Sequence, residues 1–184
     1  TAILIIMLNF RIKTICLHLL LLAFVIYPVN VSAQSSTYIK NIFTQAESYY
    51  IYEEYELANP LYLLIDDPEN MNIKYKIGTC YLNIPGEKEK SIPYLEEAVI
   101  TANINSKTES IKELRAPLDA YFSLAKAYMI NNEYEKALNT FQTFNRLASE
   151  TKTIGELKNF EYIDHMIQAC KNAIQFRQVP INFK

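Results

Sequence analysis

Residues 124–141 read LAKAYMINNEYEKALNTF, and this stretch decides the fold. It contains two amphipathic segments with helical spacing, separated by the polar turn NNE at residues 131–133. Ala125 and Ala137 are small enough for two helices to cross closely. Tyr128 and Phe141 follow one turn later on the same faces. The stretch therefore predicts a helical hairpin.

The same pattern occurs twice earlier in the chain. In each copy a small residue precedes a tyrosine by three positions, and a second small residue follows the first after twelve or thirteen positions. A large apolar residue comes four positions after that. These positions hold Ala46, Tyr49, Ala58 and Tyr62 in the first copy, and Gly78, Tyr81, Ser91 and Leu95 in the second. Such self-similarity predicts a repeat of three hairpins.

The spacing of the copies is uneven. Ala46 and Gly78 are 32 positions apart, whereas Gly78 and Ala125 are 47 apart. The excess lies in residues 103–117, which we expect to form a long connection with a helical extension at 108–114. The sequence predicts an all-α fold with helices at 37–52, 55–66, 71–83, 88–102, 117–131, 134–149 and 155–177.

The last predicted helix has an apolar stripe that suits a cap on the open end of the array. The stripe contains Leu157, Phe160, Ile163, Ile167, Cys170 and Ile174. Residues 34–178 form the expected helical domain. Residues 179–184 have an extended, apolar character, and we expect them to begin a linker to a further domain.

The first 33 residues have the pattern of a signal peptide. Arg11 and Lys13 precede the apolar run at residues 14–26, and Val31, Ser32 and Ala33 form a small-x-small cleavage signal. Cleavage after Ala33 is expected, with Met7 as the natural start; an uncleaved N-terminal anchor is the alternative. The exported chain would be periplasmic or associated with an outer membrane.

The composition excludes several functions. Without the signal peptide, 16 basic residues face 20 acidic ones, which gives a charge of −4 and argues against nucleic-acid binding. One histidine, His165, and two cysteines, Cys80 and Cys170, would then remain. No metal site, cofactor site or catalytic constellation is expected, and we predict that the protein is not an enzyme. Both cysteines are expected to be buried free thiols.

Residues 38–149 resemble the tetratricopeptide repeat. Gly78 and Tyr81, Ala125 and Tyr128, and the Ala137–Phe141 pair match its pattern, although its Trp and closing Pro are absent. The resemblance implies a right-handed α-solenoid of three hairpins plus a C-terminal capping helix.

The segments YKIGTCYLNIPGEKEKSIPYLEEA, RAPLDAYFSLAKAY and IQACKNA are similar to a wider family. In these secreted bacterial envelope proteins a tetratricopeptide module precedes a WD40-like propeller and an OmpA-like peptidoglycan-binding domain. Some members work with type IX secretion and gliding. The later domains have no counterpart in this sequence. The resemblance therefore assigns peptidoglycan binding to no residue of this sequence.

In the tetratricopeptide fold, the first helix of each hairpin lines a concave face. The resemblance places nine residues in that groove: Phe43, Glu47, Tyr50, Tyr75, Thr79, Leu82, Phe122, Lys126 and Met129. The positions that form a carboxylate clamp in chaperone-binding members hold Phe43, Glu47, Lys76, Asp119 and Ser123. This set lacks the clamp, which argues against a free C-terminal carboxylate as ligand.

Two functions remain open at this point. The first is a non-enzymatic scaffold that binds another envelope protein or peptide segment through the concave face, with no nucleic acid and only indirect membrane association. The alternative is a glycan- or peptidoglycan-binding module that uses exposed tyrosines.

Overall fold

The structure, a computed structural model, describes residues 36–150 and 162–178. The chain divides into two units, Thr1–Asn41 and Ile42–Lys184. Of the first unit, residues 36–41 are described; they are helical and exposed. The predicted signal peptide lies outside the described residues. None of the described helices is long and apolar enough to cross a membrane.

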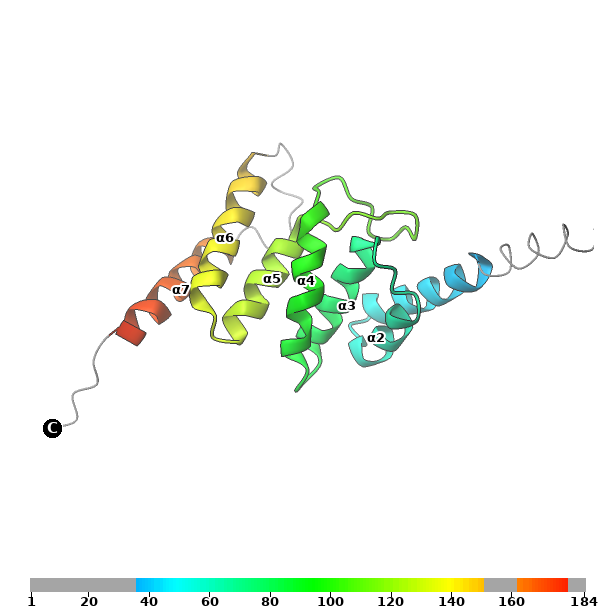
Figure 1. Cartoon of the computed structure of the whole chain (residues 1–184), viewed down its shortest axis with the longest axis horizontal. Helices are drawn as coiled ribbons and strands as arrows, with labels where there is room; N and C mark the ends of the chain where they lie inside the picture. The colour runs from blue at the N-terminus through cyan, green and yellow to red at the C-terminus, as the bar shows by residue number, and fades with distance from the viewer. Residues whose placement is uncertain (1–35, 151–161, 179–184) are drawn as a thin grey trace, which may run out of the picture. The chain divides into compact units, whose positions relative to one another are not determined.

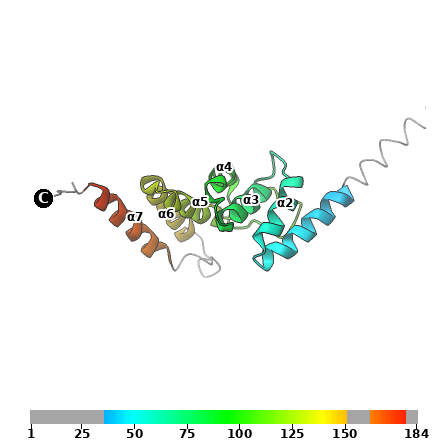
Figure 2. The ribbon, with the colours of Figure 1, turned by 90° about the horizontal axis from the view of Figure 1, so that it is seen from below.

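The second unit is all-helical over the residues described. Its first element is the helical segment 42–51, here called the leading helix. The following α-helices are α2 (Tyr55–Leu64), α3 (Met71–Asn83), α4 (Ser91–Ala98), α5 (Asp119–Ile130), α6 (Tyr134–Ser149) and α7 (Ile163–Gln178). From α2 onward each helix packs against the next one along the chain, and α3 also contacts α5 (Figures 1 and 2). The predicted all-α class is confirmed for these residues.

The observed helix bounds agree with the predicted ones where residues near the helix ends determine them. The bounds of α3 and α6 match those predicted, and Asn70 caps α3 by accepting a hydrogen bond from the Ile73 amide at 3.0 Å. The predicted helix 88–102 is instead divided. Short 3₁₀ segments, Lys88–Lys90 and Val99–Thr101, flank α4. Pro93 lies in the first turn of α4, where its missing amide costs no helical hydrogen bond.

The small residues singled out in the sequence lie where helices meet. Ala46, Gly78 and Ala125 on the first helix of each hairpin are fully buried. Their partners Ala58, Ser91 and Ala137 on the second helix are fully buried too. The large residues one turn further, Tyr62, Leu95 and Phe141, are also fully buried, as predicted.

Two of the hairpins turn in the same way. Glu53 (φ 61°) and Asn132 (φ 62°) both adopt the left-handed conformation just after a helix. The next residue donates its amide to a carbonyl five positions back, from Glu54 to Tyr49 and from Glu133 to Tyr128, at 2.9 Å in both turns. This is the hydrogen-bond pattern of a helix C-cap, and it reverses the chain within a few residues.

Two large hydrophobic cores, and a smaller cluster of Ala98, Ala116 and Ala120, hold the described part of the unit together. The first core joins the leading helix, α2 and α3, and contains Phe43, Ala46, Ala58, Tyr62, Ile73, Ile77 and Cys80. The second core joins α3 to α7, and includes Leu82, Leu95, Phe122, Phe141, Phe144, Ile163 and Cys170. Within the part of the predicted cap that is described, α7 packs on α6 through Ile163 and Cys170. Leu157 and Phe160 lie outside the described residues.

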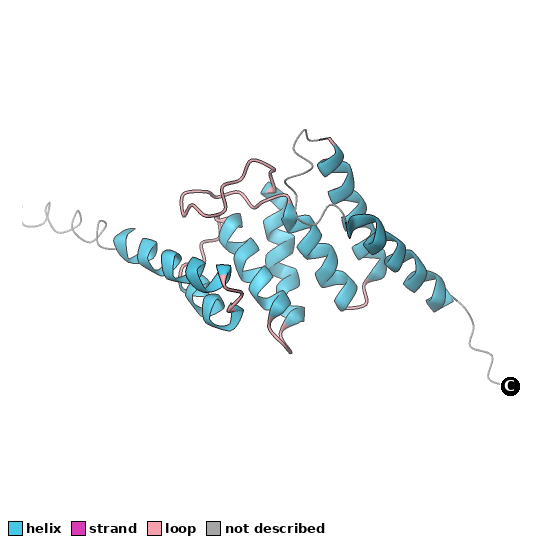
Figure 3. Ribbon diagram, turned by 180° about the vertical axis from the view of Figure 1, so that it is seen from behind, coloured by secondary structure: helices cyan, strands magenta, loops and turns pink. Residues whose placement is uncertain are grey.

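Residues 102–118, here called the connection, form a closed loop between α4 and α5 (Figure 3). A parallel bridge pairs Asn103 with Pro117 and brings its two ends together. The predicted helical extension at 108–114 is wrong, because these residues form turns. Glu113 replaces helical hydrogen bonds by accepting from the amides of Lys107 (3.2 Å) and Arg115 (3.0 Å).

Candidate functional site

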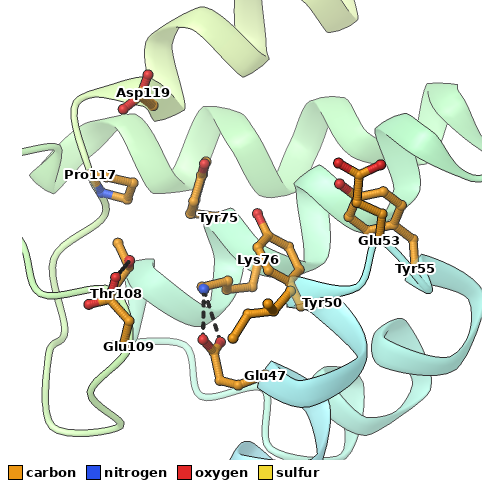
Figure 4. Close-up of a pocket in the computed structure, with 11 residues that line it drawn as sticks. Glu47, Tyr50, Glu53, Tyr55, Tyr75, Lys76, Thr108, Glu109, Pro117 and Asp119 are labelled. Atoms are coloured by element: carbon orange, nitrogen blue, oxygen red, sulfur yellow. Dashed lines mark hydrogen bonds and ion pairs between the residues drawn. The ribbon is translucent and has the colours of Figure 1, made fainter. Parts of the chain in front are cut away.

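A polar pocket of about 410 Å³ lies within the second unit, between the leading helix, α3, the start of α5 and the connection. This volume is in the range of small-ligand sites. Figure 4 shows Thr108, Glu109 and Pro117 on one side and Tyr50 and Glu47 on the other. The lining comprises Glu47, Tyr50, Ile51, Glu53, Tyr55, Tyr75, Lys76, Thr108, Glu109, Pro117 and Asp119.

A buried ion pair forms the floor of this pocket. The Lys76 ammonium lies 2.9 Å from Glu47 Oε1, and both residues are buried. Tyr62 donates its hydroxyl to the same carboxylate, and Lys76 also lies 4.2 Å from the centre of the Tyr50 ring. These partners replace water around both charges. Removing one member of such a pair leaves an uncompensated charge and costs about 3–5 kcal/mol.

Two tyrosines continue the polar surface from the ion pair. Burial raises the pKa of Tyr50 well above its ordinary value, and the neighbouring Tyr75 raises it further. Burial, followed by the Asp119 carboxylate, raises the pKa of Tyr75 to about 12. The two hydroxyls hydrogen-bond to each other and to Thr79, so they belong to the internal hydrogen bonding of the fold.

The connection supplies one wall of the pocket, and a residue of α3 holds it in place by hydrogen bonds. The fully buried Asn72 on α3 donates its side-chain amide to the Thr108 carbonyl at 3.1 Å. The Asn72 backbone amide donates to the Leu114 carbonyl at 3.2 Å. These two hydrogen bonds from Asn72 fix the connection against α3. The pocket wall that the connection forms is therefore held in place by the fold.

Three of the nine predicted groove residues meet in this pocket. Glu47 and Tyr50 come from the leading helix and Tyr75 comes from α3. Thr79, Lys126 and Met129 are partly exposed but are not among the lining residues. Their role in partner binding stays a prediction.

The other three predicted groove residues lie in the cores. Phe43 is 4% exposed, Leu82 is 3% exposed and Phe122 is 9% exposed. Phe122 makes edge-to-face contacts with Phe141 and Phe144, at ring-centre distances of 5.5 and 5.8 Å. Helices that follow in the chain cover these three side chains. The three residues therefore belong to the cores and not to the exposed surface.

Sequence reasoning did not assign several of the lining residues to a site. Thr108, Glu109 and Pro117 belong to the connection, and Glu53 and Tyr55 belong to the first turn of the array. The long spacing between the second and third copies was the one signal for the connection. In the repeat pattern, Lys76 and Asp119 occupy only positions of the carboxylate clamp, which this sequence lacks.

None of the residues considered for chemistry lines this pocket. His165 is exposed on α7. Cys80 and Cys170 are buried free thiols, as predicted, and burial raises the pKa of Cys80 to about 12, which keeps it an unreactive thiol. Over residues 36–150 and 162–178, no group of three or more His, Cys, Asp or Glu side chains is placed to hold a metal ion.

Comparison of the sequence with protein-family models gives no match, and comparison with curated proteins gives none either. The class established for this protein is therefore the one its described residues show, an all-helical domain.

Proposed function

We propose that residues 34–178 form a tetratricopeptide-type, right-handed α-solenoid of three hairpins closed by α7. The support comes from residues that occupy equivalent positions in the three hairpins. Small residues are fully buried at the same place in all three hairpins, and the turns at Glu53 and Asn132 share conformation and hydrogen bonding. Packing of each helix on its chain neighbour is also what a repeat array requires.

On this basis we propose that the protein is a non-enzymatic scaffold that binds another protein through its concave face. The observation that carries the proposal is the pocket of about 410 Å³, which three residues of the predicted groove line together. The surface there is mixed, with tyrosine rings beside carboxylates, as protein-binding surfaces commonly are. A scaffold needs only such a surface, whereas an enzyme needs a positioned acid, base or nucleophile.

The proposed location is the bacterial cell envelope. The charged, apolar and small-residue pattern of residues 1–33 supports export. The similarity to envelope proteins with propeller and OmpA-like domains supports a place as the N-terminal module of such a protein, with another envelope protein as partner.

The test is a pull-down from envelope extracts with the chain as bait. Lys126 and Met129 are partly exposed groove candidates on α5, and Met129 also packs against the second core. Lys126→Glu and Met129→Gln therefore change the surface, and glutamine keeps the length of the methionine side chain. We expect the double variant to lose the captured partner. Gln142→Glu on α6 is the matched control, because Gln142 is exposed and outside the predicted groove. Unchanged capture by the double variant would contradict binding through this face.

Glycan binding is the second candidate, since large aromatic rings are exposed to solvent. Tyr52 is 77% exposed and Tyr162 is 55% exposed. Sedimentation with purified cell-wall sacculi separates the two functions. The scaffold proposal expects the chain to stay in the supernatant, whereas co-sedimentation that Tyr52→Ala abolishes would favour the glycan module.

A further inference from the structure

The pocket combines a strong excess of negative charge with aromatic rings. Four carboxylates line it, from Glu47, Glu53, Glu109 and Asp119, against the single ammonium of Lys76, which leaves a formal charge of −3. Three tyrosines, Tyr50, Tyr55 and Tyr75, line the same cavity. Carboxylates and tyrosine faces in one concave site are the groups that attract an organic cation.

The protein already holds one cation in this way. Lys76 places its ammonium 2.9 Å from a Glu47 oxygen and 4.2 Å from the centre of the Tyr50 ring. Lys76 is only 3% exposed, so this pair is internal, and the two opposite charges offset each other. The carboxylates that a ligand can reach are those of Glu53 and Glu109, which line the pocket and are exposed.

We infer that this pocket binds an arginine side chain presented by a partner polypeptide, an inference that rests on the scaffold function proposed above. A guanidinium is planar and carries five donors, so it can bond a carboxylate through two parallel N–H groups while its face lies on a tyrosine ring. The lysine ammonium is a compact charge that lacks this geometry. Glu53 precedes α2 and Glu109 belongs to the connection, so the acceptors come from separate segments.

The connection makes the pocket selective. It brings Thr108 and Glu109 opposite the leading helix (Figure 4). Asn72 holds it there through hydrogen bonds to the carbonyls of Thr108 and Leu114. The additional residues between the second and third hairpins therefore form a wall with an acidic side chain at its surface. A fixed wall lowers the ordering cost of binding.

The test is a titration of the ¹⁵N-labelled chain with N-acetyl-arginine N-methylamide, followed by amide chemical shifts. The neutral isostere N-acetyl-citrulline N-methylamide is the matched probe. We expect the arginine probe to shift the amides of Tyr50, Tyr75 and Thr108, and to bind more tightly than the citrulline probe. Its affinity should fall as NaCl rises from 20 to 300 mM, because exposed carboxylates are screened.

Variants assign the effect to the pocket. The double variant Glu53→Gln/Glu109→Gln keeps side-chain size and removes two charges, so we expect arginine binding to weaken about five- to twentyfold, or about two- to fivefold for each exposed pair. Glu89→Gln, an exposed carboxylate on the 3₁₀ segment Lys88–Lys90, should leave binding unchanged. Equal binding of the arginine and citrulline probes, or unchanged binding by the double variant, would overturn the inference.

This result is independent of the pull-down. Capture that depends on Lys126 and Met129 while the arginine probe fails would leave the scaffold function standing and reject the arginine pocket. Capture that is insensitive to Lys126 and Met129 would reject the proposed groove whatever the probe does.

Discussion

At the scale of single residues, the packing of Gly78 shows why a small side chain is needed at a helix crossing. A β-carbon built on Gly78 would lie 2.6 Å from Leu95 Cγ and 2.8 Å from Leu95 Cδ2. Leu95 is fully buried and cannot move aside without displacing its neighbours. The other two hairpins accept alanine at this place, so the restriction comes from the partner side chain.

Two opposing effects decide the outcome of Gly78→Ala. Alanine favours a helix over glycine by about 1 kcal/mol, whereas overpacking a core costs about 1–3 kcal/mol. We expect a net loss of about 1 kcal/mol in the free energy of unfolding, measured by urea denaturation. In a Leu95→Ala background the two side-chain clashes are absent and only the approach to Leu95 N at 3.3 Å remains, so the same substitution should stabilise instead. A gain in the unaltered background would contradict the packing explanation.

At the scale of elements, two helix ends carry backbone strain that the residue types at these positions do not predict. Glu53 and Asn132 both have left-handed backbones, a conformation that glycine adopts without steric cost and that asparagine tolerates better than glutamate. The turns nevertheless form, because the amides of Glu54 and Glu133 bond to carbonyls of the preceding helix. Hydrogen bonding and the packing of the two helices outweigh the local preference.

Glu53→Gly is expected to stabilise the chain by about 1 kcal/mol, because it relieves the left-handed backbone. Asn132→Gly should give a smaller gain, since asparagine already suits that conformation. Urea denaturation midpoints of both variants measure the difference. Glu53→Ala is the matched control; it removes the carboxylate but keeps the β-carbon, so a gain equal to that of glycine would contradict backbone strain as the cause.

At the scale of the whole molecule, stability is distributed along a series of helix contacts. The first core and the second core share one helix, α3, which supplies Ile77 to the first and Leu82 to the second. α7 closes the far side of the second core with Ile163, which is 2% exposed, and Cys170, which is fully buried. Loss of α7 should therefore act mainly on its neighbours.

A chain ending at Glu150 is expected to lose about 2–4 kcal/mol of stability around α5 and α6, through exposure of the apolar surface that Ile163 and Cys170 cover. Hydrogen exchange should accelerate at amides of α6, while the amides of Ile73 and Ile77 in α3 change little. Phe176→Ala is the control, because this α7 side chain is 79% exposed and its loss should change nothing. Equal acceleration in α3 would show a single cooperative unit instead.

Local sequence was enough to predict most of the described helices, although the predicted helix 88–102 is divided and residues 108–114 form turns. Spacing of small and large residues is a local property, and it correctly predicted that the small residues of both helices in each hairpin are buried. Turn breakers and caps such as Asn70 act within one turn of a helix, so the bounds of α3 and α6 were predictable.

The tertiary structure alone decided which side chains form a site. Phe43, Leu82 and Phe122 have groove positions in the repeat pattern, yet neighbouring helices bury them. Periodicity gives the direction of a side chain, but burial depends on elements far away in the chain. The connection shows the same limit: hydrogen bonds from Asn72 and the Asn103–Pro117 bridge fold it into a wall of the pocket, and no local pattern in residues 102–118 encodes those partners.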